Sequence, residues 1–155
     1  MIRVRPAGEE DEEFILSLAY RFAQCEIPRW RTAEEIEDGT KRWLKRALSE
    51  SPRVDCIVVA VDSDGLRLGF LYAHEREDFF TGIRYGHVSE IAVISGAEGR
   101  GVAETLMQAA QDWASDRGYR RIGLNVFANN GRARRFYERL GFEPESLSYS
   151  KDLLK

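Results

Sequence analysis

The segment from Asn130 to Phe142 carries the side chains that are best suited to chemistry. It reads Asn-Gly-Arg-Ala-Arg-Arg-Phe-Tyr-Glu-Arg-Leu-Gly-Phe. This order predicts a short helix that Asn130 caps, that contains Tyr137 and that ends at Gly141. A phenol, with a pKa of about 10, is protonated at neutral pH and can donate its proton. Tyr137 is therefore a candidate general acid, although a tyrosine in such a helix can also simply pack against a sheet.

A glycine-rich helix start lies upstream, in Glu98-Gly-Arg-Gly-Val-Ala103. The first turn of a helix offers unpaired N–H donors and about half a positive charge, and glycine lets a phosphate approach them closely. Gly99 and Gly101 therefore indicate a phosphate site, to which Arg100 can add a contact; plain turn glycines are the alternative. The segment lacks the Lys-Ser/Thr of a P-loop and the third glycine of a dinucleotide fingerprint.

The remaining patterns predict the elements that position these two segments. Strands are expected over 2–5, 56–61, 67–75, 87–94 and 121–127, and helices over 9–25, 32–49, 100–117 and 130–140. One or two final strands are expected between Phe142 and Leu153. The strand-helix-strand unit over 87–127 should be parallel with a right-handed crossover, whereas the hairpins should be antiparallel. The fold class is therefore α/β (α+β), with a mixed central sheet.

Composition narrows the class of protein. The chain has 155 residues, 43% apolar and 32% charged, which fits a single domain over 1–155. A net charge of −3 gives no general attraction to nucleic acid or to an anionic membrane. No apolar run is long enough for a membrane span or a signal peptide, so we expect a cytoplasmic protein. Cys25 and Cys56 are too few for a disulfide framework, and we expect them to be buried thiols and predict no metal site.

Taken together, the two motifs resemble a known family. Glu98-Gly-Arg-Gly-Val-Ala103 resembles the Arg/Gln-x-x-Gly-x-Gly/Ala loop of the GNAT superfamily of acyl-CoA-dependent N-acetyltransferases. The strand Ile91-Ala92-Val93 before that loop is similar to the family's Leu-x-Val. A second signature of the family is similar to Asn130-x-x-Ala133-x-x-Phe-Tyr137-Glu-x-x-Gly-Phe142. The element order also looks like the family's layout, so the resemblance covers essentially the whole chain.

The resemblance implies acetyl-CoA as the cofactor, and a fold in which the strand around Ile91 splays from the strand over 121–127. Helices then cover both faces of the sheet. The pantetheine arm would pair with the strand, and the pyrophosphate would rest on the loop, while Asn130 and Ala133 contact the cofactor and Tyr137 lies near its sulfur. The implied cofactor-binding residues are Ile91, Ala92, Val93, Glu98, Gly99, Arg100, Gly101, Val102, Ala103, Asn130, Ala133 and Tyr137. Glu98 departs from the family's usual Arg or Gln.

Acetyl transfer to an amine also needs a route for the amine's proton. An amine with a pKa of about 10.4 is neutral about once in 2,500 molecules at pH 7, a cost of roughly 4.6 kcal/mol. Glu90 and His87 lie on the strand beside the proposed cleft and are the candidate general bases, with a water relay as the alternative. Simple alternation places the two on opposite faces, unless a bulge resets the parity.

The sequence says less about the acceptor site than about the cofactor site. We expect the loop over 26–31 and the connection over 75–85 to flank the acceptor pocket, and acids beside Phe79 and Phe80 suit a cationic amine. A solvated hairpin loop whose aromatic residues sit in the core or in a dimer contact is the alternative. The expected activity is direct acetyl transfer to a primary amine of a small molecule or peptide, by a possible homodimer. A catalytically silent acyl-CoA sensor and a nucleotide-binding domain are the competing hypotheses.

Overall fold

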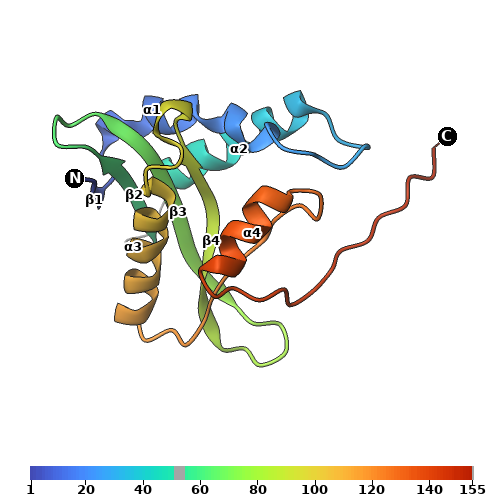
Figure 1. Ribbon diagram of the computed structural model, residues 1–155. Helices are drawn as coiled ribbons and strands as arrows, with labels where there is room; N and C mark the ends of the chain where they lie inside the picture. Colours follow the sequence, from blue (N-terminus) through green and yellow to red (C-terminus); the bar gives the residue numbers. More distant parts are fainter. Residues whose placement is uncertain (51–54, 155) are drawn as a thin grey trace.

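The computed structural model describes residues 1–50 and 55–154, which form one five-stranded sheet with helices on both faces (Figure 1). The strands lie in the order β1-β2-β3-β4-β5. The predicted mixed sheet is confirmed, because three antiparallel pairings are followed by one parallel pairing of β4 with β5. The strands are β1 (Arg3–Pro6), β2 (Cys56–Val61), β3 (Arg67–Glu77), β4 (Arg84–Val93) and β5 (Ile122–Leu124).

The parallel pair separates soon after it forms. Only Gly86–Val88 of β4 pair with Ile122–Leu124 of β5. β4 then continues to Val93, and among the described residues no strand pairs with this part of its β5-facing edge. The predicted splayed pair is therefore confirmed, and it leaves backbone donors and acceptors of β4 available at the opening.

Each face of the sheet has its own apolar core. On one face the turns η1 (Glu9–Asp11) and η2 (Ala19–Ala23) and the helices α1 (Glu12–Ser17) and α2 (Ala33–Glu50) cover Val59 and Phe70. On the other face, α3 (Val102–Asp116) packs against Leu68, Leu71 and Val88, and α4 (Gly131–Arg139) borders the same core. Figure 1 shows α3 and α4 on either side of β4.

Side chains cap the starts of α2 and α4, and Asn130 caps α4 as the sequence predicts. The backbone N–H of Thr32 donates to Oε2 of Glu35 at 2.9 Å, and the N–H of Glu35 donates to Oγ1 of Thr32 at 3.1 Å, which is a reciprocal capping box. At α4, Oδ1 of Asn130 accepts from the N–H of Ala133 at 3.2 Å. Both helix starts are therefore determined by contacts three residues apart.

Several predicted boundaries are wrong. The helix expected over 9–25 is divided into η1, α1 and η2. The β3–β4 hairpin is longer than expected and β5 is shorter, and no strand forms after Phe142 among the described residues. Ser51-Pro52, the sequence signal for the end of this helix, lies outside the described residues.

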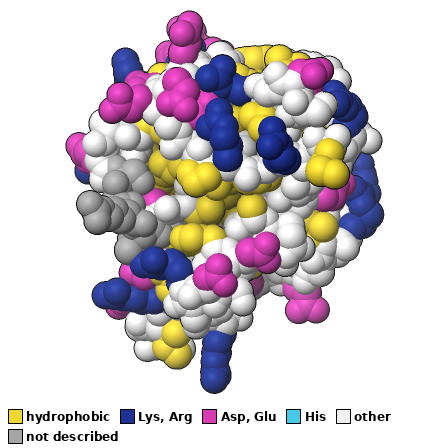
Figure 2. All heavy atoms as spheres, turned by 90° about the vertical axis from the view of Figure 1, so that its left-hand side faces the viewer, with side chains coloured by type: hydrophobic (Ala, Val, Ile, Leu, Met, Phe, Trp, Pro, Cys, Tyr) yellow, Lys and Arg dark blue, Asp and Glu magenta, His cyan; other side chains and the backbone are white. Residues whose placement is uncertain are grey.

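The surface carries charges of both signs. Figure 2 views the side on which the chain begins in Figure 1, and on it Lys and Arg side chains alternate with Asp and Glu around a central strip of apolar side chains. This mixture agrees with the small net charge of −3.

A buried carboxylate connects the first strand to the turn that follows it. Asp11 is fully buried, and it accepts from Arg5 at 2.7 and 2.9 Å, from Nε of Arg67 at 2.6 Å and from the N–H of Gly8 at 2.8 Å. The hydrogen bonds from Arg5, followed by those from Gly8 and Arg67, hold the pKa of Asp11 well below its usual range. Asp11 therefore stabilises the fold in its ionised form.

We expect Asp11→Asn to lower the free energy of unfolding by about 3 kcal/mol, because it leaves two arginines short of a buried partner. The depressed pKa means that the contribution is present above the unfolded-state pKa and is lost as the pH falls. Urea denaturation should therefore show a difference at pH 7 that shrinks toward pH 3. Asp64→Asn, in the exposed β2–β3 turn, is the matched control and should change little; an equal loss in both variants would contradict the assignment.

Candidate functional site

A cavity of about 490 Å³ opens where β4 and β5 separate. Its walls come from η2, the last residues of β4, the loop before α3, and α4. It brings together every predicted cofactor-binding residue except Arg100, namely Ile91, Ala92, Val93, Glu98, Gly99, Gly101, Val102, Ala103, Asn130, Ala133 and Tyr137. The two sequence motifs therefore line one cavity, although they lie on different elements.

The loop before α3 depends on glycine at two positions. Gly99 and Gly101 have φ of 74° and 79°, in the left-handed region that side chains rarely adopt. A Cβ at either position would point into open space, so the backbone conformation, and not crowding, selects glycine here. Gly101 is also the N-cap of α3 and supplies no side-chain cap to the first turn. The helix start is therefore open to an anion from the cavity side.

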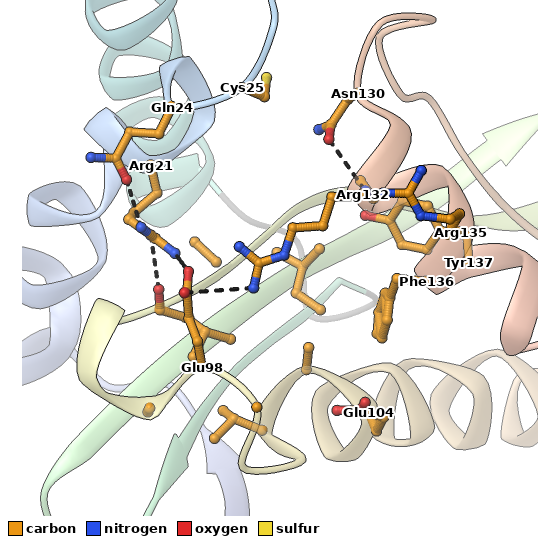
Figure 3. Close-up of a pocket in the computed structure, with 18 of the residues that line it drawn as sticks. Arg21, Gln24, Cys25, Glu98, Glu104, Asn130, Arg132, Arg135, Phe136 and Tyr137 are labelled. Atoms are coloured by element: carbon orange, nitrogen blue, oxygen red, sulfur yellow. Dashed lines mark hydrogen bonds and ion pairs between the residues drawn. The ribbon is translucent and has the colours of Figure 1, made fainter.

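Three charged residues meet across the mouth of the cavity (Figure 3). Glu98 forms an ion pair with Arg21 of η2 and a second one, at 3.5 Å, with Nη2 of Arg132 at the start of α4. Nε of Arg21 also donates to the backbone carbonyl of Val93 at 3.0 Å. The hydrogen bond from Arg21 and the charges of both arginines lower the pKa of Glu98, so its carboxylate is ionised at neutral pH.

Sequence reasoning missed the arginines of this cavity. Arg21, Arg132, Arg135 and Arg139 all line it, and the last three come from successive turns of α4. The spacing of those three was visible in the sequence as one basic helix face. Arg21 carried no such signal, because its contact with Val93 joins residues 72 positions apart.

Tyr137 lines the cavity and also packs against its neighbours. Its ring lies 5.3 Å from that of Phe136 and 5.9 Å from that of Phe142, measured between centroids. Burial raises the pKa of its hydroxyl, so the phenol stays protonated at neutral pH. The packing interpretation and the acid interpretation are therefore compatible for this residue.

A bulge in β4 places both candidate bases on one face. Tyr72 pairs with Glu90 and Ala73 pairs with Val88, which leaves Ser89 without an opposite residue. His74 pairs with His87, and its ring also lies 5.6 Å from the ring of His87. Simple alternation would have separated Glu90 from His87, whereas the bulge turns both toward α2.

Trp43 of α2 lies over Glu90. Its indole Nε1–H lies 3.0 Å from Oε2 of Glu90 and 3.0 Å from Oγ of Ser89. Burial raises the pKa of Glu90 to about 7, while the hydrogen bonds from Ser89 and Trp43 oppose that rise. The apolar pattern of its helix predicts that Trp43 packs in the core, but its side chain is partly exposed and contacts Ser89 and Glu90 at the bulge.

The pKa of His87 shifts in the opposite direction to that of Glu90. Burial, together with the charges of Arg76 and His74, lowers its pKa to about 4. Its Nε2 lies 3.3 Å from Nη1 of Arg76. His87 is therefore a neutral imidazole at pH 7. Neither His87 nor Glu90 is among the residues that line the cavity.

The expected acidic-aromatic pocket is not assembled in the hairpin. Glu75 pairs with Arg84 at 3.1 Å, and Asp78 pairs with Arg121 at 2.7 Å. Phe79 and Phe80 are 92% and 88% exposed, so they neither join the core nor plug the cavity. Glu75 and Asp78, two of the acids expected to attract a cationic amine, are thus engaged in ion pairs.

Within residues 1–50 and 55–154, no helix is long and apolar enough to cross a bilayer, and no group of three His, Cys, Asp or Glu side chains could bind a metal ion. Cys25 is half-buried and borders the cavity, whereas Cys56 is buried as expected.

Comparison with known proteins assigns the family. The model of the acetyltransferase (GNAT) family matches residues 16–142. The chain belongs to this family. N-alpha-acetyltransferase 30 of Schizosaccharomyces pombe is 34% identical over 84 residues, which cover 54% of this chain and 55% of that protein. The chain thus aligns with about half the length of this relative.

Solved structures agree with the GNAT fold. A putative acetyl transferase from Pyrococcus furiosus has a TM-score of 0.79 at 24% identity, with 99% of this chain and 100% of that chain covered. The aminoglycoside N-acetyltransferase AAC(6')-Iy in complex with CoA has a TM-score of 0.72 at 21% identity, with 99% and 95% covered. The family and fold that the two motifs predicted are therefore confirmed.

Glu98 stands where the resemblance of the motif leads us to expect Arg or Gln, and two arginines from other elements surround it. Positive charge therefore stands at the mouth of the cavity, but it comes from η2 and α4 instead of the loop.

Proposed function

We propose that this GNAT protein transfers an acetyl group from acetyl-CoA directly to a primary amine of a small molecule or peptide. The observation that carries the proposal is the cavity at the β4–β5 separation, which joins an uncapped, glycine-flanked helix start to Tyr137. A phosphate site and a phenol in one cavity fit a donor with a polyanionic end and a reactive thioester end.

In this proposal the cofactor lies along the free edge of β4. Ile91, Ala92 and Val93 offer backbone groups to the pantetheine amides, as an added strand would. The pyrophosphate approaches the N–H groups of the loop from Glu98 to Ala103, Arg100 included, and the arginines of η2 and α4 surround it. Asn130 and Ala133 border the arm on the α4 side. Binding requires Arg21 to release the Val93 carbonyl if the arm is to pair there.

The chemistry is a direct transfer. The neutral amine nitrogen attacks the thioester carbon, the carbon–sulfur bond breaks, and Tyr137 gives its hydroxyl proton to the departing thiolate. The raised pKa of Tyr137 keeps that proton available at neutral pH.

Glu90 is the proposed base for the amine proton. Its pKa of about 7 lets it accept a proton near neutral pH, whereas an imidazole with a pKa of about 4, as at His87, is a weak base. Because Glu90 does not line the cavity, the amine proton passes to it either directly from the bound acceptor or through a water.

The silent-sensor hypothesis is less well supported than catalysis. A sensor on this fold would have its acceptor side plugged by aromatic side chains, and Phe79 and Phe80 instead face solvent. The acceptor therefore approaches between the hairpin and the loop over 26–31, where Trp30 is also partly exposed.

The central test is turnover with acetyl-CoA over a panel of primary amines, measured by release of free thiol. Tyr137→Phe should lower kcat by about 10²-fold while leaving the affinity for acetyl-CoA nearly unchanged, because only the proton donor is lost. Tyr20→Phe, outside the cavity, is the matched control. Tight cofactor binding without release on any amine would favour the sensor, and unchanged turnover in Tyr137→Phe would remove the acid role.

The pH dependence of kcat/KM tests Glu90. The rate should rise with pH through about 7, because the base acts only when it is ionised. In Glu90→Gln this rise of kcat/KM with pH should be absent. In Trp43→Phe the rise should move to higher pH, since the indole hydrogen bond favours the carboxylate form of Glu90. If kcat/KM of Glu90→Gln still rises with pH through about 7, the rise belongs to another group. Trp113→Phe, on α3 and outside the cavity, controls for loss of an indole.

Glu98→Gln should tighten acetyl-CoA binding, by roughly fivefold at low salt, since it removes a negative charge from beside the phosphates. Calorimetry in rising salt should show the gain shrink as screening increases. Glu104→Gln serves as the comparison, because it removes a second acid that lines the same cavity, on the first turn of α3. Weaker binding in Glu98→Gln would mean that Glu98 mainly orients its two arginines for the cofactor.

A further inference from the structure

The face of the sheet beside Glu90 carries a line of aromatic side chains that the cofactor cavity does not use. Residues opposite each other in an antiparallel pair share one face, so Tyr72 lies beside Glu90 and His74 lies beside His87. The ring centroids of Tyr72 and His74 are 5.4 Å apart, and those of His74 and His87 are 5.6 Å apart. Tyr85 follows at 6.5 Å from His87. The line of rings therefore runs from Glu90 toward the β3–β4 hairpin.

Trp43 of α2 covers one end of this line, and the rest is partly open. Its ring lies 6.1 Å from that of Tyr72 and 6.0 Å from that of His74. Tyr72 and His87 are buried, whereas His74 and Tyr85 are half-buried and Trp43 is 38% exposed. Figure 1 shows the hairpin ends of β3 and β4 extending away from α2. We call these five side chains the aromatic row, and it offers ring surface on which a ligand can lie.

The aromatic row begins next to the cofactor cavity. Ala92, two residues beyond Glu90 on β4, lines that cavity and packs in the core beneath α1 and α2, so it faces the same side as Glu90. Glu90 therefore lies between the cavity and the aromatic row. An amine that reaches the cavity past Glu90 has the rest of its molecule over the row.

A positive charge stands at the far end of the row. Arg76 lies opposite Tyr85, on the same face, and is exposed. Its Nη1 lies 3.3 Å from Nε2 of His87, and because a guanidinium only donates, this nitrogen accepts. Among the described residues no carboxylate forms an ion pair with Arg76, whereas Arg84 and Arg121 of the same region are paired with acids. The charge of Arg76 is therefore available to an anion.

The two ends of the row are opposite in charge and well separated. Arg76 lies four residues beyond Tyr72, the residue opposite Glu90. A strand advances about 3.3 Å per residue, so the two positions are roughly 13 Å apart along the sheet, and their side chains can shorten that span. A polycation would bring positive charge against Arg76. A molecule with an amine at one end and an anion at the other is complementary to both ends.

We propose that the preferred acceptor is a primary amine whose aromatic body ends in a carboxylate, about 10 Å from the amine. The nitrogen lies at Glu90, the ring packs on the aromatic row, and the carboxylate pairs with Arg76. A carbon–nitrogen bond forms as the carbon–sulfur bond of the thioester breaks, and the amine proton passes to Glu90. The inference rests on the proposed acetyl transfer and adds the class of acceptor to it.

Steady-state kinetics with matched acceptors tests the inference. The first, para-(ω-aminobutyl)benzoate, has the amine, the ring and the carboxylate. The corresponding benzamide lacks the charge, and ω-aminooctanoate keeps the charge and a similar span but lacks the ring. We expect kcat/KM for the benzoate to exceed that for the benzamide about fivefold, because only the benzoate pairs with Arg76. It should exceed that for ω-aminooctanoate by about the same factor, since an alkyl chain cannot stack. Equal values for the benzoate and the benzamide, or a preference for the polycation kanamycin, would overturn the inference.

Variants assign the preference to particular side chains. Arg76→Gln should raise KM for the benzoate to the value for the benzamide. Arg84→Gln, which removes an arginine from the same hairpin, is the matched control and should keep the preference. His74→Ala should remove the preference over ω-aminooctanoate. Thermal melting checks that each variant folds, and a ratio between two acceptors does not change through loss of folded protein alone. A preference for the benzoate that survives in Arg76→Gln would contradict the assignment.

Acceptor binding separates failure of this inference from failure of the proposed function. Calorimetry with CoA-saturated protein measures the affinity for each acceptor without turnover. Turnover of other amines with no preference for the benzoate would refute the inference and leave acetyl transfer standing. Selective binding of the benzoate that Arg76→Gln abolishes, without turnover of any amine, would refute acetyl transfer and leave the acceptor site standing. Absence of both binding and turnover would refute both.

Discussion

The early parting of β4 from β5 is the constraint on which the rest of this structure depends. A strand edge without a neighbour leaves N–H and C=O groups that must find partners elsewhere. Here the unpaired stretch of β4 faces a cavity instead of a neighbouring strand. The glycine-rich loop, η2 and α4 are arranged around that stretch, so a ligand with amide groups can continue the sheet where the protein chain does not.

The bulge at Ser89 adds the second constraint. It turns Glu90 toward the same face as His87, below Trp43 of α2. Burial then acts on the two groups in opposite senses, since it disfavours the charged form of each. The carboxyl pKa rises to about 7 and the imidazole pKa falls to about 4. One physical cause thus makes Glu90 the better proton acceptor near neutral pH.

Sequence reasoning succeeded where the deciding contacts are local. The Thr32–Glu35 capping box and the Asn130 cap join residues three apart, and two glycines with positive φ mark the loop before α3. Sequence reasoning failed where the deciding contacts are distant in the chain. The hydrogen bond from Trp43 to Glu90, for example, joins residues 47 positions apart. The last predicted strand failed for a related reason. Its alternation is present, but a strand also needs a neighbour, and among the described residues no strand lies hydrogen-bonded beside it.

The charged residues at the cavity mouth have a consequence for ligand choice. Glu98 already neutralises part of the charge on Arg21 and Arg132, so a singly charged ligand gains little by displacing it. A ligand with several phosphate charges can engage both arginines and the open start of α3 at once, and each contact is charge-assisted. The acid at this position therefore favours a polyanion over a monoanion. Selectivity of this kind needs no dedicated side chain in the loop itself, so an acid at Glu98 is compatible with the anion site that we propose beside this loop.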